Sequence, residues 1–213
     1  MNLMPFDELN VFTEMVKDYK QQPHTLREKE RLYADIEDYI EWLLVEAYVY
    51  GNVQAVYDLR LDADPATLVD KTAMFAEINR EIAGKTYKQR IQEYLDEENS
   101  TVEDFLRVAE TDMTRVYNAG VLNGADKSGL VGVPGGTSGT SGISTANGIG
   151  GVKKRWITIR DDRVRETHDY LEGMIVPYNE DFYTYDGDHA RAPGLFSLPE
   201  NNINCRCTLE LIK

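Results

Sequence analysis

Two cysteines near the end of the sequence are the residues best suited to bind a metal. Cys205 and Cys207 are two positions apart, so on a strand both side chains would point to the same face. Zinc prefers thiolate and imidazole ligands in a tetrahedral arrangement, and His168 or His189 could complete such a set. The spacing differs from the usual Cys-x-x-Cys, and we prefer the interpretation of two half-buried apolar thiols. Apart from zinc, we expect no cofactor.

His168 is the second candidate for chemistry, because a histidine among arginines and carboxylates could act as a general base. Arg163, Arg165 and Arg206 could then stabilise phosphate charge, which makes a small nuclease or toxin-type phosphodiester-cleaving domain the alternative function. The sequence shows neither a paired-carboxylate metal site with recognisable spacing nor a second clearly placed histidine. We therefore prefer a structural histidine that joins a strand to a loop by hydrogen bonds, and we expect no enzymatic activity.

The elements that must position these residues form a small α+β module in the last third of the chain. Residues 156–159 are typical of a strand, and Asp161 or Asp162 is expected to cap a short helix that ends near Leu171. In that helix, Arg165 and Asp169 are four residues apart and could pair. After Gly173, strands are predicted at 174–176 and at 205–212. The module should therefore contain a short antiparallel sheet.

The first 128 residues predict about four helices, each with a start signal. The expected starts are Thr25 with Glu28, Asp64 before Pro65, Thr86 with Gln89, and Ser100 with Glu103. The helix from Thr25 carries an apolar stripe with a tyrosine-rich flank that includes Tyr39 and Tyr50. Such a stripe could dock a partner, but tyrosines at this spacing more often belong to a core.

Composition divides the chain into three expected parts: a helical docking region at 1–128, a linker at 129–152 and the α+β module at 153–213. The linker has no charged residue and holds 9 glycines and 6 serines or threonines, so we expect it to be flexible. Of the net charge of −14, residues 1–152 contribute −12 (14 basic minus 26 acidic) and residues 153–213 contribute −2 (9 minus 11). This acidity disfavours broad wrapping of nucleic acid.

Neither a membrane span nor a secretory signal is expected. No stretch approaches the roughly 20 apolar residues that a spanning helix needs, and MNLMPFDELN has neither a basic start nor an apolar core. We therefore expect a protein that is made in the cytoplasm and has no membrane contact.

The order of several short motifs resembles the C-terminal module of the phage head-morphogenesis family, which includes protein F of phage Mu. These motifs are K-R-W-I-T (154–158), D-D-R-V-R-E-T-H (161–168), L-E-G (171–173) and N-C-R-C (204–207). Upstream, G-K-T-Y-K-Q-R-I (84–91) and A-E-T-D-M-T-R-V-Y-N-A-G (109–120) resemble the helices that precede this module. Carried over by position, the signature residues are Trp156, Asp161, Arg163, Arg165, His168, Gly173, Asn204, Cys205, Arg206 and Cys207.

The resemblance implies a structural component of the virion. It would lie inside the capsid or at the portal vertex, in multiple copies per particle, and act in head assembly, DNA packaging or DNA delivery. The implied partners are the portal protein, the major capsid protein or both, with packaged DNA touched only through local contacts. The long Gly/Ser/Thr stretch before Trp156 and the short N-terminal region depart from the family pattern.

Overall fold

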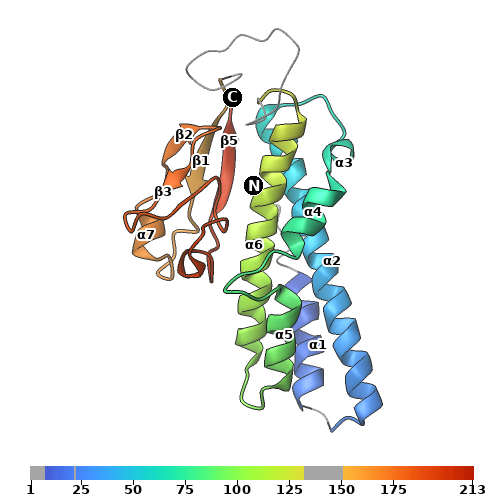
Figure 1. The fold of residues 1–213 in the computed structure, drawn as a ribbon. Coiled ribbons are helices and arrows are strands. Elements are labelled where there is room, and N and C mark those ends of the chain that lie inside the picture. The colour runs from blue at the N-terminus through green and yellow to red at the C-terminus, as the bar shows by residue number, and fades with distance from the viewer. Residues whose placement is uncertain (1–7, 22, 132–150) are drawn as a thin grey trace.

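The computed structural model describes residues 8–21, 23–131 and 151–213. The helical N-terminal part and the following α+β module lie side by side along one long helix (Figure 1). This mixed architecture confirms the predicted fold class. Most of the predicted linker at 129–152 lies outside the described residues.

The N-terminal part contains more helices than the four that the sequence predicted. They are α1 (Leu9–Gln21), α2 (Leu26–Leu59), α3 (Pro65–Leu68), α4 (Lys71–Ile78), α5 (Tyr87–Asp96) and α6 (Val102–Lys127). Helix α1 was not predicted. The single helix predicted from Pro65 is divided in two, because Val69 is extended and the Asp70 carboxylate accepts a hydrogen bond from Ala73 N at 3.0 Å, which starts α4.

Of the four helix starts predicted in the N-terminal part, three agree with the structure. Thr25 with Glu28 and Thr86 with Gln89 form the predicted capping boxes of α2 and α5. The box predicted for Ser100 with Glu103 is wrong: Thr101 and Asp104 form it, and the Asp104 carboxylate accepts from Thr101 N at 2.8 Å. The Ser100 hydroxyl instead donates to the Glu97 carbonyl at 2.9 Å, so it is used by the turn after α5.

Helices α2 and α6 form the centre of the helical part and cross at unusually short distance because glycines face each other. A Cβ atom on Gly51 would lie 2.1 Å from the Tyr117 carbonyl oxygen, and one on Gly120 would lie 2.2 Å from the Tyr48 carbonyl oxygen. No real Cβ fits at these distances, so backbone meets backbone at the crossing. The position of the whole α2/α6 pair therefore depends on these two residues lacking a side chain.

Replacing Gly120 with alanine is expected to destabilise the protein by about 1–3 kcal/mol, because the helices must move apart. Helix propensity alone predicts the opposite sign, a gain of up to about 1 kcal/mol. Urea unfolding of G120A measures the difference, and A76G at an exposed position of α4 calibrates the propensity contribution. A G120A protein as stable as the wild type, or more stable, would contradict the close packing.

The C-terminal module is built on a three-stranded antiparallel sheet with β1 in the middle. Its strands are β1 (Lys153–Ile157), β2 (Ile175–Pro177) and β5 (Thr208–Ile212), in the order β2-β1-β5. The module also contains a hairpin of two short strands, β3 (Phe182–Tyr183) and β4 (His189–Ala190). Its helices are α7 (Glu166–Asp169) and the 3-10 helix η3 (Pro199–Asn201).

Several boundaries in the module differ from the predictions. Strand β1 begins and ends earlier than 156–159, and β5 starts after both cysteines, which lie in the preceding loop. Helix α7 is capped by Arg165 and not by Asp161 or Asp162. Asp161 instead starts a separate turn, in which its carboxylate accepts from Arg163 N and its carbonyl accepts from Val164 N, and α7 begins only after this turn.

The module packs against α6 through polar side chains as well as apolar ones. The Asn118 side chain on α6 accepts from Leu209 N at 2.8 Å and donates to the Cys207 carbonyl at 3.0 Å. On α2, the Asp58 carboxylate accepts from Leu211 N at 2.9 Å. The outer edge of β5 is therefore hydrogen-bonded to two helices, and the buried residues of both parts form one continuous core.

Among the described residues, no helix has both the length and the apolar character that a membrane crossing requires.

Candidate metal centre and surrounding site

The signature residue Trp156 is the largest side chain in the centre of the module, and it is completely buried. Its ring contacts Phe182 and His168 edge to face, each at 5.3 Å between centroids, and Phe196 in a tilted arrangement at 5.7 Å. Antiparallel pairing of β1 with β5 places Trp156 opposite Leu209. The strand, the helix α7 and the loop before η3 therefore meet at this indole.

His168 lies on α7 and is 2% exposed. Its ring stacks on Phe196 at 5.6 Å, and its Nδ1 atom lies 3.6 Å from the Cys207 Sγ atom. Its Nε2 atom has no hydrogen-bond partner within the described part of the chain. His168 thus connects α7 to the cysteine loop.

Both cysteines are free, buried and directed toward His168. The loop that carries them turns at Asn204, which has a left-handed φ of 60° and donates its backbone N–H to the Thr111 hydroxyl of α6 at 2.9 Å. One ligand atom from each of His168, Cys205 and Cys207 lies within 4.8 Å of the other two. A cavity of about 10 Å³ adjoins these three side chains. The arrangement therefore has the donor set of a thiolate-imidazole metal site.

The two thiols titrate as a coupled pair. The hydrogen bond from Cys207 and the neighbouring His168 lower the pKa of Cys205 well below its usual range, although burial opposes this shift. The same hydrogen bond, with burial, raises the pKa of Cys207. Of the two thiols, Cys205 is therefore the more acidic.

His189 lies elsewhere in the module. It is on β4, where its Nδ1 atom pairs with the Asp181 carboxylate at 2.8 Å and its ring stacks on Tyr183. Of the two histidines that the sequence offered as a further ligand, the structure brings only His168 to the cysteines.

The three signature arginines surround the cysteine loop, and each has a protein partner. Arg206 binds the Asp161 carboxylate at 2.8 Å, and Arg163 approaches the same carboxylate at 3.6 Å. Burial opposes ionisation of Asp161, but hydrogen bonds from Arg206 and the Arg163 backbone, together with the positive charges of both arginines, lower its pKa. Arg165, for which the sequence suggested Asp169 as a partner, donates to the Ile203 carbonyl. These guanidinium groups hold the loop in place.

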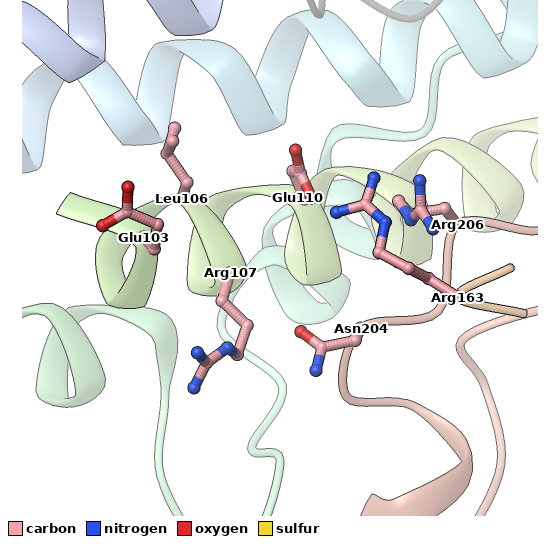
Figure 2. A pocket seen from close by; sticks show the side chains of 7 residues that line it. All are labelled: Glu103, Leu106, Arg107, Glu110, Arg163, Asn204 and Arg206. Atoms are coloured by element: carbon pink, nitrogen blue, oxygen red, sulfur yellow. The ribbon is translucent and has the colours of Figure 1, made fainter. Parts of the chain in front are cut away.

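A surface cavity of about 430 Å³ lies beside this loop, between α6 and the module (Figure 2). Its lining consists of Glu103, Leu106, Arg107 and Glu110 from α6, and of Arg163, Asn204 and Arg206 from the module. Three arginines and two glutamates give the cavity mixed charge, which offers no general attraction for a phosphate backbone. Three signature residues, Arg163, Asn204 and Arg206, therefore line a cavity on the protein surface.

Gly173 is the signature residue with a backbone role. Its φ of 72° lies in the left-handed region that favours glycine, and its N–H donates to the Trp156 carbonyl at 2.9 Å. Gly173 therefore reverses the chain between α7 and β2.

Several residues that hold the site together were not singled out from the sequence. The Asp188 carboxylate accepts hydrogen bonds from Ser197, from the Leu198 backbone and from the Asn201 side chain, and so fixes the loop that carries Phe196. Asn118 and Thr111 fix the cysteine loop from α6. The Asp-Gly-Asp run at 186–188 is a turn signal that could have identified Asp188.

Comparisons with known proteins match the same region. Residues 140–210 match the family described as Phage Mu protein F like protein. Over 58 residues the chain is 34% identical to minor head protein GP7 of Bacillus phage SPP1, covering 27% of this chain and 19% of that protein. Over 125 residues it is 26% identical to NAD(+)-arginine ADP-ribosyltransferase EFV of Enterococcus faecalis, covering 59% of this chain and 22% of that protein. No solved structure matches the chain significantly.

The chain thus spans only about a fifth of the length of these two relatives. All ten signature residues lie inside the family match, and the structure gathers most of them around Trp156, His168 and the cysteine loop. The match to a minor head protein agrees with the resemblance found in the motifs. The C-terminal module of this chain thus matches the Phage Mu protein F like family, and the partial match to GP7 supports a phage minor head family.

Proposed function

We propose that this protein is a structural component of the phage particle, located inside the capsid or at the portal vertex, where it acts in head assembly, DNA packaging or DNA delivery. The family match over residues 140–210 is the observation that carries this proposal. The portal protein, the major capsid protein or both are the proposed partners. Because the helical part is strongly acidic, we propose that it docks on protein and that any contact with packaged DNA is local.

The tyrosine-rich stripe of α2 contributes mainly to the core. Tyr48 is 1% exposed, and Tyr39 and Tyr50 are partly buried against the core. Two large aromatic groups of α2 are exposed: Tyr57 is 75% exposed and Trp42 is 42% exposed. Aromatic residues supply much contact area with little loss of rotamer freedom, so these two residues are the better candidates for docking from α2.

We propose a non-enzymatic role for the candidate site. A general base must reach the proton that it removes, but His168 is buried under Trp156 and Phe196 and faces a thiol. The arginines that could have stabilised phosphate are bound to Asp161 or to a backbone carbonyl. This geometry does not favour the phosphodiester-cleaving alternative. The ADP-ribosyltransferase relative shares only part of its length with this chain, and its named activity is not proposed here.

The location can be tested in particles of the phage that encodes this chain. We expect quantitative mass spectrometry of purified particles to find the protein in multiple copies, but far fewer than the major capsid protein. Electron microscopy with a labelled chain should place it at one vertex or in the interior, and crosslinking should connect it to the portal or capsid protein. Its absence from purified particles and from DNA-free heads would contradict the proposal.

A further inference from the structure

We propose that His168, Cys205 and Cys207 together bind one zinc ion that fastens α7 to the loop before β5. Each of the three side chains is 2–3% exposed, and their ligand atoms lie within 4.8 Å of one another. Imidazole nitrogen and thiolate sulfur are the ligands that zinc prefers in proteins. The proposal concerns the integrity of the module and holds whichever partner the protein binds in the particle.

The separation between two of the donors fits a shared tetrahedral ion. Zinc binds nitrogen at about 2.0–2.1 Å and sulfur at about 2.3 Å, so at a tetrahedral angle the two atoms are about 3.6 Å apart. The distance between His168 Nδ1 and Cys207 Sγ is 3.6 Å. The protein thus already holds these two donors at the spacing that the ion requires.

The charges of the donors suit Zn²⁺. The Nδ1 atom of His168 is the ring nitrogen that faces the Cys207 Sγ atom, so it is the nitrogen that would bind the ion. Two thiolates would neutralise the charge of Zn²⁺, so the filled site would add no net charge to the buried centre.

The space beside the ligands indicates a structural ion. Three protein ligands leave a fourth position, and the adjoining cavity of about 10 Å³ is lined by Arg163, Asn204 and Arg206 as well as by the ligands. A volume of this size holds about one water molecule. Water can therefore complete the tetrahedron, but a substrate cannot enter. The ion would connect segments that are 39 residues apart in sequence.

The test measures metal content and ligand type on the full chain. The protein is purified under reducing, chelator-free conditions after growth with added zinc, and metal is quantified by mass spectrometry. We expect about one zinc per chain in the wild type and loss to background in C205S, C207S and H168Q. H189Q is the matched control, because His189 is exposed and lies outside the cluster, and it should retain the wild-type zinc content.

A second measurement remains informative if the ligand variants fold poorly. Wild-type protein stripped of metal is titrated with Co²⁺, and a thiolate-to-cobalt charge-transfer band that Zn²⁺ then removes is the expected result. Bound Zn²⁺ should also slow the reaction of both thiols with a thiol reagent. The proposal is overturned if the wild type contains no more zinc than C205S, if no charge-transfer band develops, or if Cys205 and Cys207 are found as a disulfide under reducing conditions.

Discussion

Replacing Trp156 with alanine is expected to lower the free energy of unfolding by about 3–5 kcal/mol. The indole is completely buried, and it contacts the rings of Phe182, His168 and Phe196. Truncation removes these contacts and leaves a large cavity that the rigid sheet and the hydrogen-bonded loop cannot fill. Since natural domains are stable by only about 5–15 kcal/mol, W156A would lose a large part of its total stability. Urea unfolding followed by circular dichroism measures the loss.

Trp42 provides a matched control for this substitution. It is 42% exposed on α2, where its ring contacts Tyr39 at 5.4 Å, so W42A should cost less than about 1 kcal/mol. An ordinary surface change alters the free energy of unfolding by less than about 1 kcal/mol. If the free energies of unfolding of W156A and W42A differed by no more than this, the module would not be organised around the indole.

Replacing Arg115 with alanine is expected to cost about 3–5 kcal/mol, because it removes the buried cation that pairs with both Asp112 and Glu77. Arg115 on α6 is 1% exposed, and its guanidinium binds Asp112 at 2.8 Å and Glu77 at 2.6 Å. Asp112 is completely buried, and only Arg90, at 2.7 Å, would remain as its ion-pair partner among the described residues. The network joins α6 to α4 and α5. Thermal and urea unfolding of R115A measure the effect.

Arg107 is the corresponding control on the surface of the same helix. It pairs with Asp104 at 3.3 Å with 44% of its side chain exposed, and such pairs contribute about 0–1 kcal/mol. The double variant R115A/D112N should recover part of the loss, because it also removes the buried carboxylate charge that has lost one of its two cations. Equal stability of R115A and R107A would refute the proposed contribution of the buried network.

The sequence predicted the helical region well where a start signal is local. A hydroxyl and a carboxylate or amide three residues later are sufficient to define the starts of α2 and α5, and both boxes are present. Helix α1 was not predicted, although Leu9, Phe12 and Val16 have helical spacing and are buried. Its stability depends on packing against α2 and α6, which the local sequence does not reveal. The glycine contacts of Gly51 and Gly120 likewise depend on which helices cross.

The candidate site was predicted only in part, because it too depends on contacts between segments that are far apart in sequence. From residue types alone, both His168 and His189 were candidates to join the two cysteines, because spacing within the sequence does not determine which segment returns to the sheet. Only His168 lies beside them. Asp188 and Asn118 were not singled out. Each acts through hydrogen bonds to backbone groups far away in sequence, and no pattern of side-chain types records such a contact.

The contacts of Asn118 and Asp58 with β5 also limit how this protein can assemble with neighbours. An unpaired strand edge is a template for pairing with another chain, which is a hazard where many copies of capsid proteins are concentrated. Here side chains from α6 and α2 occupy backbone groups along the outer side of β5, and the opposite strand β2 ends in Pro177, which has no N–H to donate. Neighbouring subunits should therefore meet this module through side chains, and strand exchange between copies is disfavoured.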